Sequence, residues 1–217
     1  IRALFRFGLP AGLQGIAMNV AGVLLLRFIG SLPHSAEAQA AYAVGYAELF
    51  SLITWTSVGL MGAAAAVAGQ NLGAGHPQRA SQAVRIAAQF GVGVAVTVGA
   101  LFLLIPEKLL AIFGLQDPTV VQLGRQLLRY LSVSGLFITV ALTYTGGLQG
   151  TGDTRSPLYI TLISQVLLPL GICFTADAMG ALQSTTVWTA ILVGHFTRCV
   201  LSVARFQQGH WRKIAVE

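Results

Sequence analysis

Charged residues are scarce in this chain of 217 residues: 13 are Lys or Arg and 7 are Asp or Glu. A water-soluble domain carries about 25% charged residues, so 9% leaves too little charge to cover an aqueous surface. Cysteine is also scarce, and the 2 present cannot build the disulfide framework of a small secreted domain. A disordered chain would be poor in apolar residues, whereas 55% of this one is hydrophobic. The class that remains is an integral membrane protein.

Six stretches without Asp, Glu, Lys or Arg, each at least 20 residues long, cover most of the chain. A bilayer core about 30 Å thick needs about 20 apolar residues in a helix. The stretches lack the alternation of apolar and polar residues that barrel strands require. We therefore predict an all-α membrane protein with six transmembrane helices, at roughly 7–28, 42–71, 84–105, 119–147, 157–177 and 185–207. A short interfacial helix is expected near 107–113, started by Pro106.

Basic residues divide unequally between the two ends of these predicted helices. One end holds Arg2, Arg6, Arg79, Arg85, Arg155, Arg205, Arg212 and Lys213, with Arg198 nearby, and the other holds Arg27, Lys108, Arg125 and Arg129. Because cytoplasmic loops carry an excess of Lys and Arg, we expect both chain ends in the cytoplasm, with the protein in a bacterial-type inner membrane. The net charge of +6 is spread thinly between apolar stretches, so no nucleic-acid partner is expected.

The segment GLMGAAAAVAGQNLGAGHPQRA, residues 59–80, combines small residues with helix-ending glycines. Its alanines and glycines form a face that lets membrane helices approach closely. Gly tolerates the left-handed backbone that ends a helix, so the helix should stop before Pro77. The residues of interest in this motif are Gln70, Asn71, Gly73 and Gly75.

A second glycine-rich segment, TGGLQGTGDTRSP, spans residues 145–157. Gly150 and Gly152 can end one helix, and Asp153 or Thr154 can cap the start of the next. No strand precedes the glycines and no Gly-Lys-Ser/Thr follows them, so a phosphate-binding loop is not expected.

Four segments resemble, in the right order, signatures of the multidrug and toxic compound extrusion (MATE) transporters. They are FGLPAGLQGIAMNV (7–20), GQNLGAGHPQRA (69–80), GGLQGTGDTRSPLYI (146–160) and ARFQQGHWRKIAV (204–216). The family has twelve helices in two lobes of six. The resemblance implies that residues 1–217 form a single transmembrane lobe, the C-terminal one, and that the N-terminal lobe of the same polypeptide is missing.

The same resemblance implies export of drugs or toxic metabolites by H⁺ or Na⁺ antiport with alternating access. The substrate would be a small organic molecule, cationic or amphipathic, held in a cavity between the lobes. An alternative is a related flippase of lipid-linked oligosaccharides, which needs a more cationic cavity. No enzymatic activity, cofactor or resident metal is expected, because the histidines and cysteines lack catalytic or metal-binding spacing.

One departure from the family leaves the coupling ion open. One branch of the family forms a cation site from a Glu in the first helix and an Asp in the fourth helix of this lobe. Met18 and Asn19 lie where that Glu would fall, and no acid occurs between Arg129 and Asp153. The resemblance therefore implies that coupling rests on an acid elsewhere.

Polar residues within the spans are the candidates for a transport site. Glu48 is the leading one, at the non-cytoplasmic end of the second helix, although a carboxylate in interfacial water is the alternative. Gln14 and Asn19, with Met18, could face the cavity, or the two amides could join helices by hydrogen bonds. His195 has no acid near it in sequence, and we expect a core or interface histidine.

Thr143 and Tyr144 end the fourth helix near its cytoplasmic mouth. They are the remaining candidates for the cavity. Their hydroxyl groups could contact substrate or sit at the membrane interface.

Overall fold

The computed structural model describes the backbone of residues 2–213 and the side chains of residues 8–10 and 12–212. Its regular structure is helical throughout these residues. The spans are α1 (Arg2–Gly30), α2 with the π-helical η1 and α3 (Ser35–Tyr42, Ala43–Leu49, Ser51–Gly73), α4 (Pro77–Leu104), α6 (Pro118–Gly150), α7 with the π-helical η2 and α8 (Arg155–Thr161, Leu162–Leu167, Leu168–Ala178), and α9 (Ser184–Gln207). A short α5 (Pro106–Ile112) and a 3₁₀ turn, η3 (His210–Lys213), complete the chain.

Within residues 2–213, six helical spans are long and apolar enough to cross a membrane, which confirms the predicted number. The second and third begin at Ser35 and Pro77, earlier than the expected 42 and 84. The predicted helix starts followed the stretches without charged residues. Helices extend past the hydrocarbon into the headgroup layer, where charged residues are tolerated, so these two helices begin earlier in the sequence. The short helix α5 begins at Pro106, as expected.

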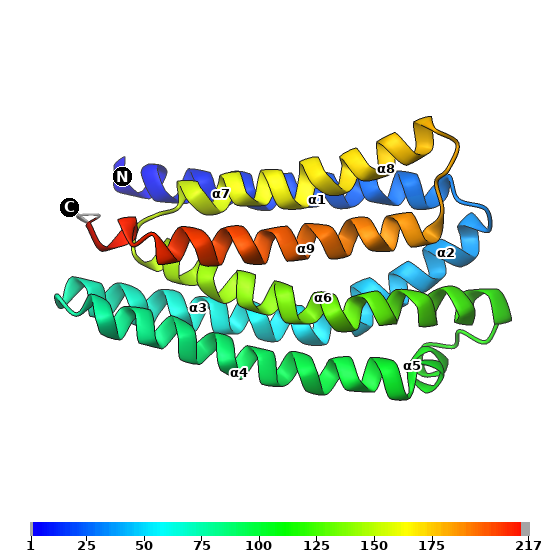
Figure 1. Ribbon diagram of the computed structural model, residues 1–217, viewed down its shortest axis with the longest axis horizontal. Coiled ribbons are helices and arrows are strands. Elements are labelled where there is room, and N and C mark those ends of the chain that lie inside the picture. The colour runs from blue at the N-terminus through cyan, green and yellow to red at the C-terminus, as the bar shows by residue number, and fades with distance from the viewer. Residues whose placement is uncertain (1, 214–217) are drawn as a thin grey trace.

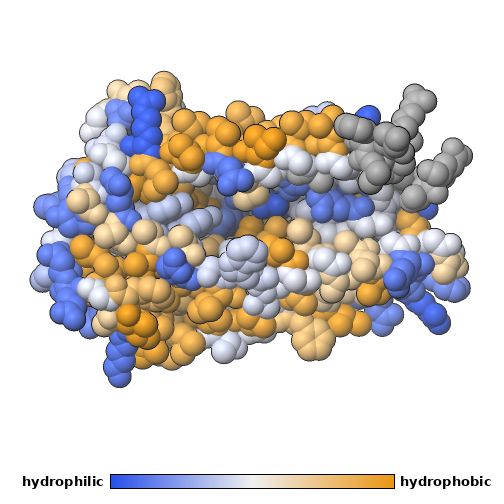
Figure 2. Space-filling view, turned by 180° about the vertical axis from the view of Figure 1, so that it is seen from behind, coloured by the Kyte–Doolittle hydropathy of each residue, from blue (hydrophilic) through white to orange (hydrophobic). Residues whose placement is uncertain are grey.

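Helix α6 runs through the middle of the bundle, with α9 on one side and α3 and α4 on the other (Figure 1). Its apolar window is 72% buried, against 18% to 44% in the other spans. Those other helices therefore turn an apolar face outward. Figure 2 shows hydrophobic residues predominating along the sides and hydrophilic residues gathered at both ends of the long axis. Hydrophobic sides with hydrophilic ends are what a protein that spans a lipid bilayer requires, so the chain is an integral membrane protein.

Both termini of the bundle lie at one end: α1 begins and α9 ends there, beside the α3–α4 and α6–α7 connections (Figure 1). This end carries Arg79, Arg155 and Arg212. The opposite end carries α5 and the α1–α2 and α8–α9 connections. An even number of spans returns the chain to the end where it began, as observed. The side chains of Arg2, Arg6 and Lys213, which the charge count included, lie outside the described ones.

Glycines bring α3 and α6 into backbone contact. A Cβ added at Gly146 would overlap the carbonyl oxygen of Met61, and one added at Gly150 would overlap that of Ala65. A Cβ at Gly69 would in turn lie 2.6 Å from the carbonyl oxygen of Gly150. Residues four apart lie on one helix face, so these positions form a matched stripe on each helix. The glycine motifs therefore set how closely α3 and α6 pack.

Candidate functional site

A cavity of about 690 Å³ opens between four spans. They are α1, the span that contains η1 and α3, the span that contains η2 and α8, and α9. The volume of the cavity is in the range of small-molecule sites. The wall is mainly apolar and aromatic, and its polar side chains include Asn19, Gln165 and His195. No Lys, Arg, Asp or Glu is among the described residues that line it.

Two π-helical segments supply part of this wall. Segment η1 carries Tyr46 and η2 carries Gln165. A π turn is rare and is frequently found at functional sites, where it displaces side chains from the regular helical register. Just after η2, Pro169 also lines the cavity, and a Cβ at Gly194 of α9 would lie 3.0 Å from its Cγ. The local irregularity of the span thus coincides with the cavity.

Aromatic rings stack behind and along the cavity wall. Tyr42 and Tyr46 are nearly parallel, with ring centroids 5.0 Å apart, and Trp188 stacks on Tyr42 at 6.2 Å. His195 lies against Tyr46 at 6.5 Å and against Phe50 at 5.7 Å. These contacts fix the orientation of the imidazole ring and pack it in the way expected of a core histidine. His195 nevertheless also lines the cavity.

Arg198 lies one turn of α9 beyond His195, and both are buried, with 2% and 3% of their surface exposed. The Arg198 Nη1 donates to the sulfur of Met18 over 3.7 Å. The Arg198 Nε and the His195 Nδ1 have no hydrogen-bond partner among the residues described. Sequence reasoning placed Arg198 near the cytoplasmic end and so missed this pair. Their spacing of three within the predicted 185–207 helix is the signal that could have found it.

The three candidates on α1 lie at or near the cavity. Met18 and Asn19 line it, and the Asn19 amide donates to the Gly15 carbonyl oxygen. Gln14 is buried beside it, where its Nε2 donates to the Thr161 hydroxyl over 2.8 Å and its Oε1 accepts from Gln149 over 3.1 Å. Gln14 therefore joins α1 to α7 and α6, the interhelical alternative.

The three remaining candidates lie elsewhere. Glu48 is exposed, in η1, and does not line the cavity. The buried Thr143 hydroxyl donates to the Thr139 carbonyl oxygen over 2.8 Å. Tyr144 lines a separate hollow of about 370 Å³ beside Arg85, and its ring meets Phe206 edge-on. The structure does not bring these residues together with Met18 and Asn19, and their part in transport stays a prediction.

The first glycine motif ends α3 in a tight turn. Gly75 has φ of 76°, which favours glycine, and its N–H donates to Leu72. The Asn71 side chain donates back to the Val67 carbonyl oxygen, and the Asn71 carbonyl accepts from the N–H of His76. Gln70 and Gly73 have exposed positions on the last turn. These contacts support a structural role for the motif.

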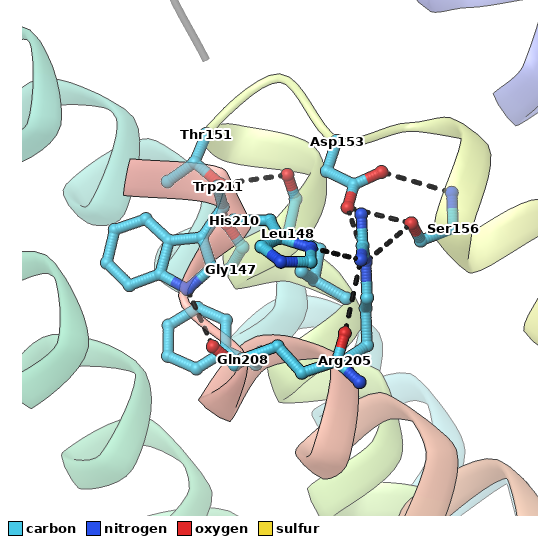
Figure 3. A network of polar contacts seen from close by, with 10 residues as sticks. Gly147, Leu148, Thr151, Asp153, Ser156, Arg205, Gln208, His210 and Trp211 are labelled. Atoms are coloured by element: carbon cyan, nitrogen blue, oxygen red, sulfur yellow. Dashed lines mark hydrogen bonds and ion pairs between the residues drawn. The ribbon is translucent and has the colours of Figure 1, made fainter. Parts of the chain in front are cut away.

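The second motif is tied to the end of α9 through Asp153 (Figure 3). Gly152, with φ of 93°, turns the chain, and the Asp153 carboxylate accepts from the N–H and hydroxyl of Ser156 over 3.1 and 2.8 Å, which caps α7. Asp153 is 7% exposed and pairs with the Arg205 Nε at 3.0 Å. Arg205 also donates to the Ser156 hydroxyl and contacts His210 Nδ1 at 2.8 Å. Because a guanidinium only donates, that imidazole nitrogen must accept.

The chain after α9 folds back over the bundle. The Trp211 indole N–H donates to the Phe206 carbonyl oxygen over 2.8 Å, and the two rings stack at 4.8 Å. Both rings are buried in an apolar cluster with residues of α3, α4 and α6. The tail motif is therefore a cap on this end of the bundle; its residues 214–216 lie outside those described.

Comparisons with known proteins agree with this architecture. The MatE family model matches residues 10–175. The Probable multidrug resistance protein NorM of Thermotoga maritima is 27% identical over 99% of this chain and 46% of its own length, and that of Deinococcus radiodurans is 26% identical over 95% and 46%. A solved multidrug resistance MATE family transporter in an outward-facing conformation superimposes with a TM-score of 0.86 at 18% identity, over 97% of this chain and 47% of that one. The chain thus spans about half the length of these relatives.

Proposed function

Since the chain belongs to the MatE family, we propose that it forms one lobe of a secondary exporter of drugs or toxic metabolites. The observation that carries the proposal is the cavity of about 690 Å³ within the membrane-spanning part, walled by four of the six spans. Drug-sized ligands bind in cavities of this volume, with a mainly apolar wall and a few polar groups.

The proposed mechanism is alternating access. A second lobe of the same polypeptide, outside these 217 residues, would close the open side of the cavity and rock against this lobe. Export would be driven by H⁺ or Na⁺ antiport. No described lining residue is acidic, so the coupling acid would come from the second lobe or from Glu48.

The absence of Lys and Arg from the described cavity lining favours an exporter over the alternative, a flippase of lipid-linked oligosaccharides. A pyrophosphate-linked substrate carries several negative charges, which a cationic wall would have to balance. One buried guanidinium behind Met18 is less than such a substrate requires.

We test the proposal with the full-length polypeptide in liposomes loaded with a fluorescent drug. An imposed H⁺ or Na⁺ gradient should drive the drug across the membrane, and residues 1–217 alone should fail because half the cavity wall is missing. Glu48→Gln should slow this flux if Glu48 couples transport. Gradient-driven flux by the 217-residue chain alone would contradict the two-lobe proposal.

We also propose that the chain ends lie in the cytoplasm of a bacterial-type cell, on the basis of the basic residues at that end. On a cysteine-free background, His76→Cys and Arg212→Cys should react with an impermeant maleimide only from the cytoplasmic side. Lys108→Cys, at the opposite end, is the matched control and should react only from outside. All three positions are exposed, so accessibility is set by topology. The reverse labelling pattern would invert the orientation.

A further inference from the structure

The side chains of Arg198 and His195 form a buried pair on one face of α9, deep within its span. Arg198 lies nine residues before the last residue of α9, Gln207, which is about 14 Å at 1.5 Å rise per residue. A charged group at such depth faces the bundle interior or a cavity, and pairs with an opposite charge or with several acceptors.

Arg198 has no such compensation within the described part of the chain. The ion pairs there join His34 to Glu37, Arg125 to Glu107 and Arg205 to Asp153, and none includes Arg198. Among the described residues, the one hydrogen bond of its side chain goes to the Met18 thioether, which is a weak acceptor, and its Nε has no hydrogen-bond partner. A guanidinium kept for packing alone would direct its donors to carbonyl oxygens, since an unpaired buried charge is costly.

The buried polar atoms without hydrogen-bond partners lie next to the cavity. His195 lines the cavity directly and its Nδ1 has no partner among the described residues. Met18 also lines the cavity, and its sulfur is the atom that accepts from the Arg198 Nη1. Methionine has three flexible side-chain bonds, so a rotation of Met18 would break this weak hydrogen bond and free the Arg198 Nη1 to donate to a ligand.

We propose that Arg198 and His195 form a subsite for the acidic group of the transported substrate, a carboxylate or sulfonate, whose aromatic body packs against Tyr42, Tyr46 and Trp55 of the cavity wall. The inference rests on the proposed exporter function and names its substrate class. An arginine binds a carboxylate through charge-assisted, often paired, hydrogen bonds, and the imidazole provides another polar contact. The substrate is then an amphipathic organic acid, where the family resemblance suggested a cationic or amphipathic compound.

The experiment uses the purified full-length polypeptide and two rhodamine dyes that differ in one group, a free benzoate and its methyl ester. Binding is measured by fluorescence anisotropy in detergent, and transport in liposomes. Arg198→Met should weaken binding of the free acid by about tenfold and leave the ester unchanged, because only the acid loses a charge-assisted bond. Arg198→Lys should keep most of the preference. Arg129→Met, an exposed arginine of α6, is the matched control and should change neither dye.

The other outcomes show whether the subsite or the proposed exporter function has failed. Equal loss of both dyes in Arg198→Met, or no loss of either, overturns the subsite. Export of the ester by the wild type without any preference for the acid leaves the exporter standing and also overturns the subsite. Arginine-dependent binding of the acid without gradient-driven transport supports the subsite and contradicts the exporter. If Arg198→Met does not fold, competition on the wild type decides: benzoate should displace the acid dye and benzamide should not, and equal competition by the two overturns the proposal.

Discussion

Gly150→Ala is expected to force α3 and α6 apart and to destabilise the bundle by about 3 kcal/mol. The added methyl group would overlap the carbonyl oxygen of Ala65, which belongs to the backbone of α3. A flexible side chain can move aside at little cost, but a helix backbone cannot, so the whole helix must shift. Helix α6 also packs on α4 and α9, and its separation from α3 would loosen the most buried element of the fold.

Gly62→Ala is the matched control, since it adds the same methyl group to α3 at a position with open space. Alanine favours helix more than glycine does, so Gly62→Ala should leave stability unchanged or slightly higher. The measurement is the apparent melting temperature in detergent, followed by loss of the monodisperse peak in size-exclusion chromatography. Equal melting temperatures for Gly150→Ala and Gly62→Ala would mean that α3 and α6 do not meet at Gly150.

Combining Gly146→Ala with Gly150→Ala should cost less than the sum of the two single changes. Both methyl groups press on the same stripe of α3, at Met61 and Ala65. Once one substitution has separated the helices, the second enters space that is already open. If the two losses of stability simply added, Gly146 and Gly150 would be making independent contacts and would not share one α3–α6 interface.

The number and order of the membrane helices could be predicted because they depend on composition alone. A bilayer excludes charge over about 20 residues, and the gaps between charged residues therefore mark the spans. Turn chemistry is equally local: Gly75 and Gly152 take positive φ, and Asp153 caps α7, within a few residues of where the sequence indicated. These features need no knowledge of neighbouring helices.

The cavity could not be predicted in the same way, because it depends on which helix face meets which neighbour. In lipid, apolar residues lie on both the packed and the outer faces, so hydrophobicity does not separate them. The π-helical segments η1 and η2 add to the difficulty, since each shifts the side chains that follow it around the helix axis. Glu48 in η1 is accordingly exposed away from the cavity lining, whereas the less conspicuous His195 lines it.

Asp153→Asn is the second substitution from which we expect a large effect, a loss of about 2–3 kcal/mol. Asparagine keeps one oxygen that can cap α7 through the N–H of Ser156, but it removes the charge that balances Arg205. Asp153 is nearly fully buried and Arg205 is about one-third exposed, so solvent screens the pair only partly. The loss should appear as a lower melting temperature in detergent and faster proteolysis of the segment after α9.

The chain provides a control with the same chemistry in a different environment. Glu107 and Arg125 pair at 2.9 Å, but their side chains are 63% and 45% exposed, so Glu107→Gln should change stability by less than about 1 kcal/mol. Arg205→Gln combined with Asp153→Asn should recover part of the single-mutant loss, because no charge is then left unpaired. The ion pair of Asp153 and Arg205 holds the α6–α7 connection against the end of α9, and we attribute its strength to the burial of Asp153. Equally small losses of stability in Asp153→Asn and Glu107→Gln would contradict that attribution.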